Sequence, residues 1–139
     1  MVDRARLEQM LSNLRSYASV LEGLARVPEK DFLASPDRIG NAKYHFVIAI
    51  ECCIDVANHI IASENLRFPH DNADSFVVLV EHGILEEALR EPLRAMAKFR
   101  NRLVHLYWDI DERRVCAYLH ESLGDFDRFA RAIADRFRE

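Results

Sequence analysis

Residues 35–61 read SPDRIGNAKYHFVIAIECCIDVANHII, and this stretch decides the fold class. Ser35 is a good helix cap, and Pro36 suits the first helical position because its missing N–H would have no partner there. Apolar residues then recur every three or four positions, as on one face of a helix. They are Ile39, Ala42, Phe46, Ala49, Cys53 and Ile60. The stretch predicts a long helix that buries this face in a core.

On the N-terminal side, leucines at helical spacing predict another long helix over about residues 3–24, ended by Gly23 and Pro28. On the C-terminal side, the polar stretch LRFPHDNAD predicts a loop because Pro69 interrupts it. A short helix follows, for which we expect Asp74 as the cap and Gly83 as the end.

Two more helices complete the prediction. One covers about residues 86–106, where Pro92 predicts either a kink or a regular part that begins near Glu91. The other is a single terminal helix capped by Asp109 or Asp111, with apolar residues repeating over 115–137. The chain is therefore expected to be all-α, an up-and-down bundle of about five helices.

Composition supports one helical domain over residues 1–139. Half of the residues are apolar and only four glycines and four prolines occur, so the chain can bury a core without strands, metals or disulfides. Three cysteines without a CxxC spacing are expected to be reduced core thiols. Charged residues from position 3 onward predict neither a signal peptide nor a membrane span, and hence a cytoplasmic protein without membrane partners.

The charge is unevenly distributed. The net charge of −4 argues against a surface that is basic all over. Residues 90–107 nevertheless hold five basic residues and one acid, so this segment has a net charge of +4 and the rest of the chain has a net charge of −8. The basic residues are Arg90, Arg94, Lys98, Arg100 and Arg102. This strip is either part of an RNA groove or a solvated helix face.

Polar residues cluster where the fourth predicted helix ends, in the sequence FRNRLVHLYWDID at positions 99–111. Arg100 and His105 are five positions apart, so a regular helix turns them about 140° from each other. Three arrangements would let them act on one ligand: the helix loosens before His105, the guanidinium reaches round the helix, or a second copy of the chain completes the site.

An arginine and a histidine suit phosphodiester cleavage in RNA. The guanidinium binds phosphate, and the imidazole can move a proton at neutral pH. RNA carries its own nucleophile, the 2′-hydroxyl, so this reaction needs no metal or other cofactor. The alternative is structural, because basic residues in the last turn of a helix also stabilise its C-terminus.

The spacing Arg100, four residues, His105, one residue, Tyr107 resembles the R-x-x-x-x-H-x-Y motif of the HEPN superfamily, and more narrowly the HepT toxins. Asn101, the following WDID and the segments IAIECCIDVANHIIA and FVVLVEHGIL are also similar to that group. The resemblance covers nearly the whole chain.

The resemblance implies a homodimeric, metal-independent endoribonuclease, the toxin of a type VII-like toxin-antitoxin system. Arg100 would then bind the scissile phosphate, Asn101 would help to position it, and His105 would be the general acid or base. A nucleotidyltransferase antitoxin of the MNT type would inactivate the toxin by adding AMP to Tyr107. The alternative is a non-catalytic HEPN dimer that docks such a partner.

Other polar residues are expected to flank the dimer cleft. Glu51, Asp55 and His59 recur every four positions in the second long helix, and Arg102 follows the motif arginine. The first three would share one helix face, but no second ligand-bearing helix with a Glu-x-x-His repeat accompanies them, so no metal site is expected.

Overall fold

The computed structural model describes residues 1–138, without the side chain of Tyr107, and confirms the all-α class. The described part contains helices and no strand. The α-helices are α1 (Arg4–Ala25), α2 (Glu29–Leu33), α3 (Pro36–Ser63), α4 (Asn72–Glu81), α5 (Arg90–His105), α6 (Glu112–Glu121) and α7 (Leu123–Arg136). Single 3-10 turns, η1 (Glu87–Leu89) and η2 (Tyr107–Asp109), flank α5.

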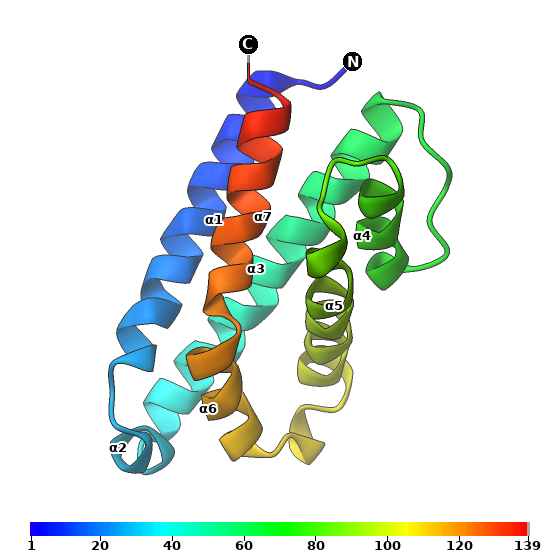
Figure 1. Cartoon of the computed structure of the whole chain (residues 1–139). Coiled ribbons are helices and arrows are strands. Elements are labelled where there is room, and N and C mark those ends of the chain that lie inside the picture. The colour runs from blue at the N-terminus through cyan, green and yellow to red at the C-terminus, as the bar shows by residue number, and fades with distance from the viewer. Residues whose placement is uncertain (139) are drawn as a thin grey trace.

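Helix α3 is the centre of the bundle (Figure 1). It packs against α1 on one side and against α4 and α5 on the other, and α7 runs antiparallel along α1. The length and apolarity of α3 would also suit a membrane span, but half of its most apolar window is buried within the protein. The common core contains the fully buried residues Phe46, Ala49 and Ile60 of this helix, so the apolarity of α3 is that of a core helix.

The helix starts follow local capping chemistry, with one correction. As predicted, Ser35 caps α3, where its Oγ accepts the N–H of Arg38 at 3.2 Å. The prediction of Asp74 as the cap of α4 is wrong. Asp71 has the extended backbone of a cap, and its Oδ1 accepts the N–H of Asp74 at 2.7 Å.

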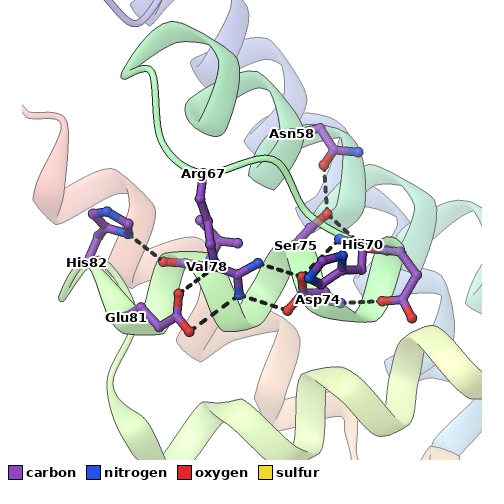
Figure 2. A network of polar contacts seen from close by, with 9 residues as sticks. Asn58, Arg67, His70, Asp74, Ser75, Val78, Glu81 and His82 are labelled. Carbon is purple, nitrogen blue, oxygen red and sulfur yellow. Dashed lines mark hydrogen bonds and ion pairs between the residues drawn. The ribbon is translucent and has the colours of Figure 1, made fainter.

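Asp74 instead ties the α3–α4 connection to α4 through Arg67 (Figure 2). The guanidinium donates to both carboxylate oxygens of Asp74, at 2.7 and 2.9 Å, and its Nε donates to Glu81 at 2.8 Å. These hydrogen bonds from Arg67 hold the pKa of Asp74 well below its usual range. Together with the backbone N–H of His70, which donates to Oδ2 of Asp74 at 2.9 Å, Arg67 therefore fixes the loop along α4.

The predicted single terminal helix is two helices, α6 and α7, with a break at Ser122. The Ser122 N–H still bonds to the Tyr118 carbonyl, and Ser122 and Gly124 both have low helix propensity. The apolar repeat continues through the break, which is why periodicity alone predicted one helix. Asp111 caps α6, one of the two predicted candidates.

Helix α5 begins at Arg90, so Pro92 lies in its first turn. A proline is tolerated there because the first N–H groups of a helix have no partner within it. This agrees with the expected regular start near Glu91. The short helix α2 was not predicted, so the bundle has more helices than expected although its class is confirmed.

Candidate functional site

The polar cluster lies on the last turns of α5. The helix is regular through His105, and the first residue outside it is Leu106, with φ −130° and ψ 38°. The Leu106 N–H still bonds to the Arg102 carbonyl at 2.8 Å. The expectation that the helix might loosen before His105 is therefore wrong, because the helical hydrogen bonds continue one residue further.

Arg100 and His105 occupy different sides of α5. The buried side of the helix carries Leu93, Met96, Ala97, Phe99 and Leu103. Arg100 borders this side and is half-buried, whereas Asn101, Arg102 and His105 are exposed. The separation of about 140° expected for five helical positions therefore holds within one chain.

The guanidinium of Arg100 reaches across to α3. Its Nε and Nη2 both donate to Oε1 of Glu51, at 3.1 and 2.7 Å, and its Nη1 donates to Oδ1 of Asn101 at 3.1 Å. No hydrogen bond joins Arg100 to His105 in the described part of the chain. The arrangement in which Arg100 reaches round the helix to His105 is thus also wrong. The guanidinium turns toward α3 instead, where Glu51 supplies a carboxylate.

These bonds orient Arg100 without using all of its donors. A guanidinium has five N–H groups, and three are engaged with Glu51 and Asn101, so one remains on each of Nη1 and Nη2. The side chain is 20 % exposed. Arg100 is therefore a fixed, partly desolvated cation that can still donate two hydrogen bonds to an anion such as phosphate.

The three α3 residues that sequence reasoning grouped have separate surroundings. Glu51 pairs with Arg100. Desolvation and the Glu51 carboxylate raise the pKa of Asp55, while the charges of Arg6 and Arg100 oppose the shift. Nε2 of His59 accepts the N–H of Asp3 at 3.2 Å, at the start of α1.

His59 therefore ties α3 to α1 and does not contact the Arg100 cluster. The proximity of Arg6 to Asp55 carried no signal in the sequence, because the two residues lie on different helices. Among residues 1–138, no group of three His, Cys, Asp or Glu side chains is arranged to hold a metal.

Beyond α5, the η2 turn carries Tyr107 and Trp108. The side chain of Tyr107, the residue expected to be modified, lies outside the described part of the structure. Trp108 is 70 % exposed, and the neighbouring Val104 and Leu106 are each about two-fifths exposed (39 % and 41 %). The end of α5 thus presents apolar and aromatic surface beside the polar cluster, which sequence reasoning had not assigned to a site.

Together, the fold and this helix end define an all-α bundle domain with an oriented arginine between two helices and an exposed histidine at the helix terminus. A family model described as Ribonuclease HepT-like matches residues 7–133, and the chain belongs to this HepT-like family.

Similar proteins include named nucleases. The chain is 34 % identical to the mRNA nuclease HepT of Shewanella oneidensis over 60 % of this chain and 62 % of that protein. It is 24 % identical to the tRNA nuclease HepT of Aphanizomenon flos-aquae, over 91 % and 86 % of the two chains.

Solved structures share the fold. The tri-AMPylated HEPN toxin of Shewanella oneidensis, in complex with its MNT antitoxin, aligns with a TM-score of 0.86 at 22 % identity, over 93 % of this chain and 96 % of that one. The Bacillus subtilis protein YutE, described as a cytosolic protein of unknown function, aligns with a TM-score of 0.84 at 20 % identity, over 97 % and 90 %. The recognised HEPN-type helical fold is thereby confirmed.

Proposed function

We propose that this chain is a cytoplasmic, metal-independent endoribonuclease, the toxin of a two-component system. The observation that carries the proposal is Arg100, held by Glu51 with two donors left for a phosphate, on the same helix as an exposed His105. Membership of the HepT-like family and the nuclease names of its relatives support an RNA substrate.

In the proposed reaction, Arg100 binds the scissile phosphate and stabilises the charge that develops on it, and Asn101 helps to position it. The 2′-hydroxyl attacks phosphorus, a P–O bond forms to the 2′-oxygen, and the bond to the 5′-oxygen breaks. His105 acts as the base that takes the 2′ proton or as the acid that protonates the leaving 5′-oxygen. The products are a 2′,3′-cyclic phosphate and a 5′-hydroxyl.

The separation of Arg100 and His105 on α5 supports a site shared by two copies of the chain. In a two-fold dimer, Arg100 of one protomer would face His105 of its partner, which removes the need for both to point the same way. Glu51, Asp55 and Arg102 would flank this cleft. His59, bonded to the start of α1, is better explained as a structural residue.

Mixing two inactive variants tests the shared site. A dimer of one Arg100→Ala and one His105→Ala chain has one intact site if the residues combine across chains, and none if each site uses its own chain. After random exchange, we expect about a quarter of the wild-type cleavage rate to return. No recovery, with both variants dimeric by light scattering, would contradict the shared site.

We further propose that an MNT-type nucleotidyltransferase partner inactivates the toxin by adding AMP to Tyr107, as the AMPylated toxin complex suggests. Phosphates attached near Arg100 would compete with the RNA phosphate for the same guanidinium. The test is intact mass spectrometry with peptide mapping of residues 99–113, with and without the partner, alongside RNA cleavage in EDTA. An unmodified Tyr107 and no cleavage in either sample would favour the non-catalytic docking role.

A further inference from the structure

The connection between α3 and α4 is held in one conformation at both of its ends. At the end of α3, Asn65 has a left-handed backbone, with φ 55°, and the Leu66 N–H bonds to the Ile61 carbonyl at 2.9 Å. Asparagine adopts this backbone at a lower cost than most residues. Toward α4, the guanidinium of Arg67 bonds to both carboxylate oxygens of Asp74 (Figure 2). The surface between the two helices is therefore formed before any ligand binds.

A cavity of about 510 Å³ lies between this connection and the adjoining ends of α3 and α4. This volume is in the range of small-molecule sites, which typically combine apolar walls with a few polar groups. The apolar side of the cavity includes Ile61, Leu66 and Phe68, and the polar side includes three asparagines and Asp71. Neither Arg100 nor its partners line it, so the cavity is separate from the candidate site on α5.

The polar side of the cavity offers a carboxylate and free amide oxygens. Among the described residues that line the cavity, Asp71 is the only charged one. Its Oδ1 caps α4 by accepting the Asp74 N–H, and its Oδ2 accepts no hydrogen bond within residues 1–138. The side chains of Asn65 and Asn72 are exposed and, in the same part of the chain, also form none. A cationic group with several N–H donors complements these acceptors, whereas the carboxylate would repel an anion.

The apolar side of the cavity includes an aromatic ring that is open to solvent. Phe68 is 88 % exposed. The guanidinium of the neighbouring Arg67 is already bonded to Asp74 and Glu81. The face of a phenyl ring attracts a cation and also packs against an alkyl chain. Phe68 is therefore available to a ligand that combines positive charge with a hydrocarbon body.

We propose that this cavity binds a primary aliphatic ammonium ion, such as the end of a diamine or polyamine. The ammonium group donates its N–H groups to Oδ2 of Asp71 and to asparagine amide oxygens, and the alkyl chain lies against Phe68 and Leu66. The site is independent of the proposed ribonuclease function.

An NMR titration of the backbone amides with butane-1,4-diamine tests the site, and butane-1,4-diol is the uncharged ligand of the same length. The buffer has physiological ionic strength, at which interactions between exposed charges are screened. We expect the diamine to shift the amide signals of residues 58–75 to saturation and the diol to leave them in place. Shifts spread over the whole acidic surface, or equal shifts with the diol, would overturn the proposal.

Two matched variants test the carboxylate. Asp71→Asn removes the charge but keeps a side chain that caps a helix, and Asp37→Asn removes the same charge from the first turn of α3, at its other end. Asp71→Asn should weaken diamine binding about tenfold, because a hydrogen bond to a charged group becomes a neutral one. Asp37→Asn should leave the affinity unchanged. Equal losses would overturn the proposal, because they would show a response to net charge alone.

The aromatic contact has its own pair of variants. Phe68→Leu keeps an apolar side chain without a ring and should weaken diamine binding about threefold. Phe68→Trp should strengthen it, because tryptophan is the aromatic residue that attracts cations most strongly. Both variants should fold, since the side chain is exposed. The same affinity in all three proteins would overturn the contact between the cation and the ring.

Discussion

Replacing Glu51 with glutamine should slow RNA cleavage without unfolding the protein. Glutamine keeps an oxygen that can accept from Arg100, but it removes the charge that strengthens the two bonds to Oε1. A hydrogen bond to a charged group is worth about 1.5–3 kcal/mol and a neutral one about 0.5–1.5 kcal/mol. The change therefore weakens the orientation of Arg100 by about 1–2 kcal/mol, which corresponds to about a tenfold loss in rate.

The effect on stability should be smaller. The Glu51 side chain is 39 % exposed, and pairs at this exposure contribute at most about 1 kcal/mol to folding after solvent screening. A domain of this kind has a total stability of about 5–15 kcal/mol, so the variant remains folded at 25 °C. Urea unfolding and single-turnover cleavage of a short RNA, measured on the same preparation, separate the two effects.

Glu91→Gln is the matched control. It removes the same charge from an Arg–Glu pair on α5, the exposed pair with Arg94, and should leave the cleavage rate within about twofold of the wild-type value. A Glu51→Gln protein that cleaves RNA at the wild-type rate would refute the positioning role of Glu51. Equal losses in the two variants would attribute the effect to net charge.

Three further outcomes follow from the fold. Phe46→Ala should lower the free energy of unfolding by about 3–5 kcal/mol in urea denaturation, because the side chain is fully buried and leaves a cavity. Ser35→Ala should lower it by about 1 kcal/mol through loss of the α3 cap, and Ser35→Asp should not. Arg67→Met should destabilise the protein at pH 7, and this difference should shrink below the ordinary Asp74 pKa of 3.8, because the lowered pKa stabilises only while the carboxylate is charged. A difference between the wild-type and Arg67→Met proteins that stays constant down to pH 2 would contradict the Arg67–Asp74 contribution.

The sequence was informative where local chemistry decides structure. Ser35 was recognised as a cap, and Asp111 was one of two candidates for another, because a short polar side chain before an apolar run satisfies free N–H groups. The break at Ser122 was missed because the apolar repeat crosses it without a change of phase. Asp74 was mistaken for a cap because its actual partner, Arg67, lies in a loop whose path depends on tertiary packing.

In the candidate site, too, the sequence indicated what depends on local spacing and missed what depends on tertiary contacts. The motif spacing located Arg100 and His105, and helical geometry correctly gave their opposed directions. Spacing could not show that Glu51 holds Arg100, because that contact joins residues 49 positions apart in the chain.

The antiparallel pairing of α1 and α7 has a mechanical consequence. Both chain termini lie at one end of the bundle, and the end of α5 lies at the opposite end (Figure 1). A pulling force applied between the termini would therefore separate α7 from α1 progressively, one helical turn at a time, before the force acts on α5. Single-molecule pulling should show a low-force first step, and a handle or surface attached at either terminus should leave the far end of the protein accessible.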